Sequence, residues 1–158
     1  MTGTVAAPLA VRPAGRFGVA GWCLFDWAMS AYNTVIGTFV FSVYFAASVW
    51  GDPTEGSAVW AFWLGISGAA AAILSPVLGA VADRGGRVKP WLGVFVLLTI
   101  VPTAGLFAVE PDPAFVVLAI VLILVSATAF ELSSVFYNAM LSVVATPDRL
   151  GRVSGWGW

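Results

Sequence analysis

The sequence predicts an all-α integral membrane protein with four complete transmembrane helices and the start of a fifth. Of its 158 residues, 60% are apolar and only 9% are charged, whereas about a quarter of the residues in soluble domains are charged. A bilayer core of about 30 Å needs about 20 apolar helical residues. Four segments with almost no charge reach or nearly reach that length, and they are residues 17–50, 57–82, 91–109 and 114–145.

The composition also argues against several functional classes. The chain has no His and a single Cys, Cys23, which excludes a His-based catalytic triad, a Cys/His zinc site and an internal disulfide. It contains no phosphate-binding loop of the Gly-x-x-x-x-Gly-Lys-[Ser/Thr] type. The formal net charge of −1 gives no indication of nucleic-acid binding. We therefore expect a protein that is not an enzyme and that has no metal, cofactor or nucleic-acid partner.

The first helix is expected to follow a short cytoplasmic tail, residues 1–16. Arg12 and Arg16 before an apolar run are also typical of a signal peptide. That run is too long for a signal peptide and carries Asp26. We therefore interpret residues 17–50 as a retained membrane span.

Proline and aspartate mark how the later helices begin. Asp-Pro pairs at 52–53 and 112–113 each offer an N-cap followed by Pro at the first helical position. Pro76 and Pro102 lie inside apolar segments, where membrane helices tolerate them as kinks. The segments after these Asp-Pro pairs are therefore predicted to be the second and fourth spans.

The charges predict the orientation. All seven Lys and Arg residues lie in the tail or in alternate loops. The charged residues in the loops between them are all acidic. The positive-inside rule places the N-terminus and the loops 83–90 and 146–152 in the cytoplasm. Residues 153–158 are expected to start a fifth helix, the alternative being a four-helix protein with a short amphipathic tail.

A loop motif follows the second span, at residues 79–89 (GAVADRGGRVK). A carboxylate at a helix C-terminus is unfavourable alone, because the helix dipole is negative there, so Asp83 is expected to have a partner. An ordinary basic loop explains the charges but not the spacing. The motif resembles the loop signature between helices two and three of the major facilitator superfamily. The resemblance implies a conformational latch at Gly79, Asp83, Arg84, Gly86 and Arg87.

Other segments resemble one branch of that superfamily. A second Asp-Arg-x-Gly-Arg loop is formed by Asp148, Arg149, Gly151 and Arg152. The stretches that carry the resemblance are GWCLFDWA at 21–28, SAYN at 30–33, FYNAML at 136–141 and GRVSGWGW at 151–158. They are similar to the bacterial "unknown major facilitator" group, relatives of the autophagy-related vacuolar amino-acid effluxer.

The resemblance implies the N-terminal part of a twelve-helix bundle in a bacterial inner (plasma) membrane. The expected partners are then the lipid bilayer, a small-molecule substrate, a coupling proton and the missing C-terminal half. The expected function is secondary active transport by alternating access, with amino-acid efflux as its specific form. The alternative is a membrane-embedded assembly or anchor subunit without transport activity.

Polar residues inside the spans are the candidate site. An acidic residue near the middle of a membrane helix costs roughly 2.5–3.5 kcal/mol, so it needs protonation, a partner or water. Asp26 precedes Asn33, and Glu131 precedes Asn138, by two helical turns, so each pair shares one helix face. Because the two spans run antiparallel, matching depths pair Asp26 with Asn138 and Asn33 with Glu131.

We expect the first and fourth spans to face each other across a polar cavity, where Glu131 and Asn33 touch substrate or a coupling proton. The alternative is that these groups only bond to each other and hold the helices together. Tyr32 and Tyr137 precede the two Asn residues and are placed in the cavity, with lipid or core contact as the alternative. Tryptophans near the span ends, Trp22 and Trp60 among them, predict an interfacial belt. A row of small residues predicts close helix packing: Gly65, Gly68, Ala72, Ser75 and Gly79.

Overall fold

The computed structural model describes residues 15–85, 88–145 and 149–157. All regular structure in these ranges is helical. Four helical segments are long and apolar enough to cross a membrane, and they are Phe17–Val49, Pro53–Ala82, Val88–Ala108 and Pro113–Leu141. The predicted all-α class with four candidate spans is confirmed, and the spans overlap the four predicted ranges.

The first span is built from four pieces: α1 (Arg16–Tyr32), η1 (Asn33–Phe39), α2 (Phe41–Tyr44) and η2 (Phe45–Val49). The span is not a regular α-helix throughout, because η1 and η2 are π-helical. The Val40 amide donates to the Val35 carbonyl at 3.1 Å, five residues back instead of four. This register leaves carbonyls near Gly37 free for other donors.

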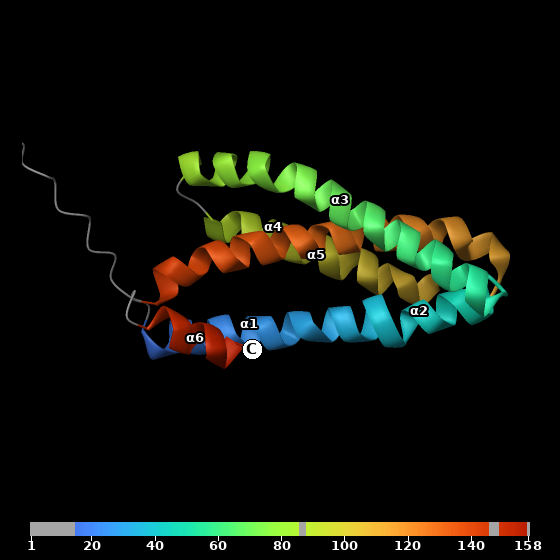
Figure 1. Ribbon diagram of the computed structural model, residues 1–158, viewed down its shortest axis with the longest axis horizontal. Coiled ribbons are helices and arrows are strands. Elements are labelled where there is room, and N and C mark those ends of the chain that lie inside the picture. Colours follow the sequence, from blue (N-terminus) through green and yellow to red (C-terminus); the bar gives the residue numbers. More distant parts are fainter. Residues whose placement is uncertain (1–14, 86–87, 146–148, 158) are drawn as a thin grey trace, which may run out of the picture.

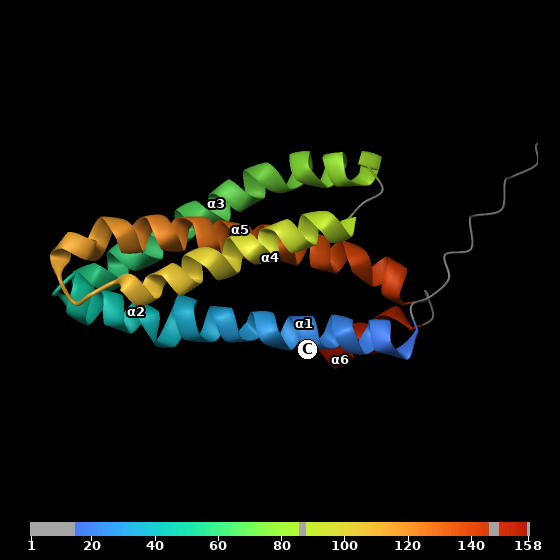
Figure 2. The ribbon, with the colours of Figure 1, turned by 180° about the vertical axis from the view of Figure 1, so that it is seen from behind.

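The remaining elements follow in an up-and-down order. They are α3 (Pro53–Gly85), α4 (Val88–Gly105), the short turns η3 (Leu106–Ala108) and η4 (Pro113–Phe115), α5 (Val116–Val144) and α6 (Leu150–Gly157). Figures 1 and 2 show the four spans side by side, with α6 turning back along α1. Pro76 lies inside α3 and Pro102 inside α4, so neither proline ends its helix.

The predicted Asp-Pro helix starts are confirmed. One carboxylate oxygen of Asp52 accepts the backbone N–H groups of Thr54 and Glu55, each at 2.8 Å. Asp112 caps in the same way, through the Ala114 amide at 2.7 Å, although it caps the short turn η4 that leads into α5. Both caps satisfy amides that the first helical turn leaves without a partner.

Charge distinguishes the two ends of the bundle. The connections from the first span to α3 and from α4 to α5 lie together at one end, which carries acidic side chains, and we call it the acidic end: Asp52, Glu55, Glu110 and Asp112. The opposite end, which we call the basic end, contains the starts of α1, α4 and α6. Its described basic residues include Lys89, Arg149 and Arg152.

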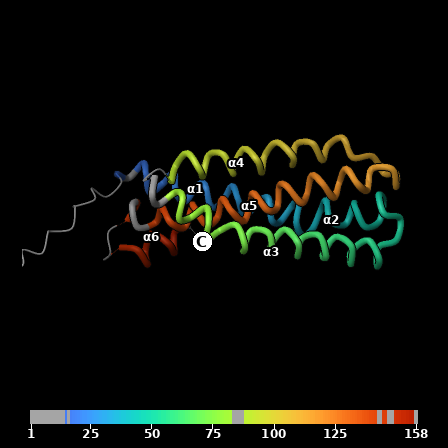
Figure 3. The backbone as a smooth tube through the Cα atoms, turned by 90° about the horizontal axis from the view of Figure 1, so that it is seen from above, coloured from blue at the N-terminus to red at the C-terminus, as the bar shows by residue number. Residues whose placement is uncertain are grey.

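The core follows α5. Figure 3 shows α5 between α4 and α3, and its buried side chains include Ile123 and Phe136. Toward the acidic end, Phe45 and Val49 of the first span pack with Trp60 of α3. Large apolar side chains stay exposed on the outer faces, such as Ile73 at 74% and Val117 at 71%. Exposed apolar surface of this extent is what a helix bundle presents to lipid.

Candidate substrate cavity

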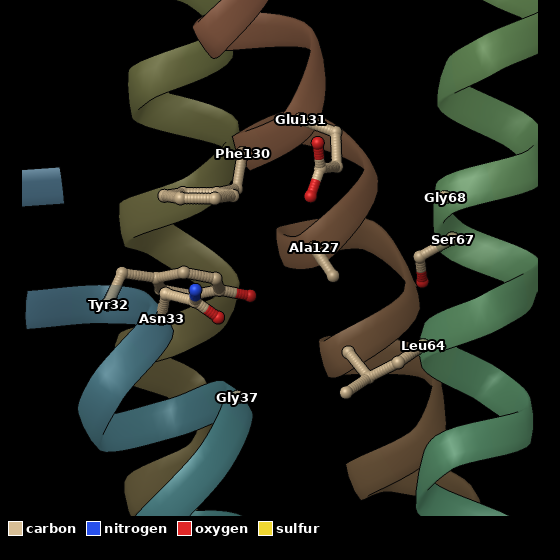
Figure 4. A pocket seen from close by; sticks show the side chains of 9 residues that line it. All are labelled: Tyr32, Asn33, Gly37, Leu64, Ser67, Gly68, Ala127, Phe130 and Glu131. Atoms are coloured by element: carbon tan, nitrogen blue, oxygen red, sulfur yellow. The ribbon is translucent and has the colours of Figure 1, made fainter. Parts of the chain in front are cut away.

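A pocket of about 150 Å³ lies between the first span, α3 and α5. Figure 4 shows its lining side chains approaching from the three elements. The lining residues are Tyr32, Asn33, Gly37, Leu64, Ser67, Gly68, Ala127, Phe130 and Glu131. The lining combines one carboxylate, one amide and hydroxyl groups with apolar walls, a composition typical of small-molecule sites.

The structure brings Asn33 and Glu131 to the same pocket, as their matched depths predicted. Asn33 is the central residue of the span Phe17–Val49. Glu131 lies one residue past the centre of α5. In Figure 4 the Glu131 carboxylate and the Asn33 amide extend from facing helices toward the shared space.

Gly37 positions the Asn33 side chain. A Cβ atom at Gly37 would lie 3.0 Å from the Asn33 carbonyl oxygen Oδ1. The amide therefore rests against the helix at a position where glycine has no side chain to interfere. The Gly37 carbonyl in turn accepts the indole Nε1–H of Trp60 at 3.0 Å.

Tyr32 forms the wall of the pocket next to α5. Its hydroxyl is 2.9 Å from the Ser126 hydroxyl, and its ring stacks on Phe130 with centroids 4.7 Å apart. Glu131 lines the same pocket as Tyr32. The expected cavity position of Tyr32 is thus observed. Ser126 was not among the predicted site residues, although it holds the Tyr32 hydroxyl from a position one helical turn before Phe130.

The second predicted pair is not formed. Asp26 lies beside the Tyr137 hydroxyl, whereas Asn138 is exposed. Tyr137 is buried against α1: its ring stacks on Trp22 at 4.4 Å, and the two side chains each donate to the other residue's backbone carbonyl, at 3.2 and 3.4 Å. Neighbours on a helix point about 100° apart, so burying Tyr137 turns Asn138 away from α1. Tyr137 is therefore a core residue and not a cavity residue.

Polar groups follow one face of the first span beyond the pocket. Ser30, Asn33, Thr34 and Thr38 are all exposed. The hydroxyls of Ser30 and Thr34 donate to the carbonyl four residues earlier, which keeps them close to the helix. Polar residues of membrane spans face the bundle interior or a water-filled cavity and not lipid. This face is therefore expected to line an aqueous space.

Two other expectations are corrected by packing. Trp22 and Trp60 are buried, 7% and 4% exposed, and so do not belong to an interfacial belt. Gly65, Gly68 and Gly79 have open space around their Cβ positions within the part of the chain that the structure describes. The row of small residues on α3 therefore has no helix packed closely on these glycines there.

The latch residues are only partly covered by the structure. Gly79, Asp83 and Arg84 belong to the second half of α3, with the side chains of Asp83 and Arg84 outside the description. Gly86, Arg87 and Asp148 lie outside the described residues. Arg149 precedes α6, and Gly151 and Arg152 are exposed within it, so α6 begins slightly before the predicted position near 153. The latch stays a prediction.

Comparison with known proteins finds two similarities. Residues 43–152 match the family described as "Vacuole effluxer Atg22 like". The chain is 34% identical over 140 residues to an uncharacterized MFS-type transporter, YxiO, of Bacillus subtilis (strain 168), a match that covers 87% of this chain and 32% of the relative. The chain thus spans about a third of the length of that curated relative. No solved structure matches it.

Proposed function

Because this chain belongs to the family of Atg22-like vacuole effluxers, which are membrane transporters of the major facilitator type, we propose that it forms the N-terminal part of a secondary transporter. The transporter moves a small solute by alternating access. One observation supports this most: a carboxylate and an amide, Glu131 and Asn33, line one pocket, with Asn33 at the centre of its span and Glu131 near the centre of α5. Binding at the midplane is what rocking-type transporters require.

The cost of placing a carboxylate deep in the bilayer favours a functional role of Glu131 over a structural one. An acidic side chain at the bilayer centre is expensive unless it is paired, protonated or hydrated. The spans Phe17–Val49, Pro53–Ala82, Val88–Ala108 and Pro113–Leu141 contain Lys89 as their one Lys or Arg residue, and it lies at the basic end. Glu131 therefore has no cationic side chain beside it from these spans, and we assign it to a coupling proton or to a cationic group of the substrate.

The substrate class follows from the same pocket. A carboxylate beside an amide and the stacked rings of Tyr32 and Phe130 suits an ammonium group. Amino acids carry such a group, and their efflux is the specific form of the proposal. Either a bound proton or the ammonium group of a substrate would neutralise the charge of the Glu131 carboxylate, which explains a carboxylate at this depth.

The proposal also includes a water-filled path and a conformational latch. The exposed row Ser30, Asn33, Thr34 and Thr38 would line the water-filled path toward the remaining helices of a twelve-helix bundle. The motif that follows Gly79 would act as the latch between the two halves, on the cytoplasmic side of a bacterial inner membrane.

The test is transport by the complete open reading frame in proteoliposomes, using a panel of labelled amino acids with and without a pH gradient. We expect Glu131→Gln to remove pH-dependent flux, because a neutral amide cannot exchange a proton. Glu110→Gln is the matched control, since Glu110 is exposed at the acidic end outside the pocket. Unchanged pH-dependent flux in Glu131→Gln would exclude the role assigned to this carboxylate.

A further inference from the structure

A second cavity, of about 300 Å³, lies between the first span and α3 on the acidic-end side of the pocket. Three hydroxyl residues line it, Thr38, Ser42 and Ser57. Ser57 belongs to the opening turns of α3, directly after the connection at the acidic end. Because its polar lining consists of uncharged groups, this cavity is suited to water and to small polar solutes.

The two cavities are consecutive parts of one groove. Gly37 and Leu64 line both of them. On α3 the lining residues Ser57, Trp60, Leu64 and Ser67 recur every three or four positions, which places them on one helix face. The groove therefore runs from the acidic end to Asn33 and Glu131.

Leu64 and Gly37 form the boundary between the two cavities. At Gly37 the boundary is formed by the backbone. Its carbonyl accepts a hydrogen bond of 3.0 Å from the Trp60 indole, which holds this part of the boundary in place. Trp60 is itself fixed by ring contacts with Phe41 and Phe45 at 5.6 and 5.2 Å. The Leu64 side chain is partly buried against the core that contains Trp60, and in Figure 4 it extends from α3 toward the first span. Unlike the Gly37 backbone, this side chain can change rotamer. An apolar side chain between two polar cavities blocks water and solutes by dewetting.

We propose that the cavity of Thr38, Ser42 and Ser57 is an entry vestibule from the acidic end to the Asn33–Glu131 pocket, and that Leu64 is its gate. The vestibule admits water and small polar solutes, and rotation of the Leu64 side chain connects it to the pocket. The inference builds on the proposed function for the meaning of the pocket, but solvent access to the groove can be measured without any transport.

The experiment measures the reaction rates of single cysteines with a membrane-impermeant cationic methanethiosulfonate added from outside intact cells. The cells express the complete open reading frame with Cys23→Ser and no other cysteine. Ser57→Cys reports on the vestibule, and Ser67→Cys, 1% exposed, reports on the pocket beyond the gate. We expect Ser57→Cys to react readily and Ser67→Cys slowly.

Adding Leu64→Ala should raise the Ser67→Cys rate by about tenfold, because a methyl group replaces the isobutyl barrier, and Leu64→Phe should lower it. Neither change should alter the Ser57→Cys rate, which also verifies the fold of each variant. Leu98→Ala, on the exposed face of α4, is the matched control and should change neither rate.

Equal Ser67→Cys rates with Leu, Ala and Phe at position 64 would overturn the gate. An unreactive Ser57→Cys would overturn the vestibule. Both readouts are independent of flux. If Leu64 controls labelling while Glu131→Gln transports normally, the vestibule stands and the role of Glu131 in the proposed function fails.

Discussion

At the scale of single residues, the candidate pocket depends on one missing side chain. Asn33 is able to lie against its own helix because position 37 is glycine, with its Cβ position 3.0 Å from the Asn33 oxygen. The carbonyl of the same glycine is held by Trp60. Gly37 thus controls both the orientation of the amide and the backbone that carries it.

This arrangement predicts the effect of Gly37→Ala on transport. The new methyl group displaces the Asn33 amide from its place facing Glu131, so we expect a weaker apparent substrate affinity, by about tenfold, with a smaller change in maximal rate. Concentration-dependent uptake measures it. Gly65→Ala is the control, since its Cβ meets nothing within 4 Å in the described structure. Equal affinities for the two variants would show that the Asn33 position does not affect binding.

Residue depth was predictable from sequence, but rotation about the helix axis was not. Distances along antiparallel spans suffice to match Asn33 with Glu131, because each residue adds a fixed rise. Whether Tyr137 or Asn138 faces α1 depends instead on the ring packing of Trp22 and Tyr137. That packing involves partners 115 residues apart, which no local pattern reveals.

At the scale of elements, the π-helical register of the first span was the least predictable feature. The helix starts are local: an Asp-Pro pair provides its own cap, so Asp52 and Asp112 were identified correctly. The π-helical turn η1 contains a carbonyl with a partner from another element, because the Trp60 indole donates to the Gly37 carbonyl. Trp60 lies near the end of its span in the sequence, which suggested contact with lipid, but its side chain is buried in the core.

The contact between η2 and α3 is the tightest in the described structure at a glycine. A Cβ atom at Gly56 would lie 2.6 Å from the Ala46 Cα and 2.9 Å from the Ala46 carbonyl oxygen. Both are backbone atoms, so a side chain at position 56 requires one helix to move. Glycine is therefore the residue that allows the first span and α3 to approach each other beside the vestibule.

Gly56→Ala should accordingly destabilise the protein by about 1–3 kcal/mol, the usual cost of overpacking a close contact. Reversible unfolding of the detergent-solubilised protein in a denaturant series measures the change in the free energy of unfolding. Gly68→Ala is the matched control on the same helix, with open space around its Cβ in the described structure, and should be neutral or slightly stabilising. A neutral Gly56→Ala would mean that the two helices are not held at this distance.

At the scale of the whole molecule, charge is segregated between the two ends of the bundle. The described basic residues Lys89, Arg149 and Arg152 lie at one end, and the acidic loops lie at the other. The chain's alternation of basic and acidic connections becomes two chemically distinct ends only because four spans alternate in direction. The positions of the charged residues along the sequence predicted this segregation, since it needs no side-chain packing.

We predict that the basic end faces the cytoplasm, because positively charged loops are retained there during insertion. Single cysteines at Lys89→Cys and Glu110→Cys, in the Cys23→Ser background, test it with an impermeant maleimide on intact and permeabilised cells. Both positions are exposed. Glu110→Cys should react in intact cells and Lys89→Cys only after permeabilisation. Reaction of both positions in intact cells would contradict the topology. It would also contradict the proposed vestibule, which opens to the outside, and the proposed alternating access to the pocket from the two sides of the membrane.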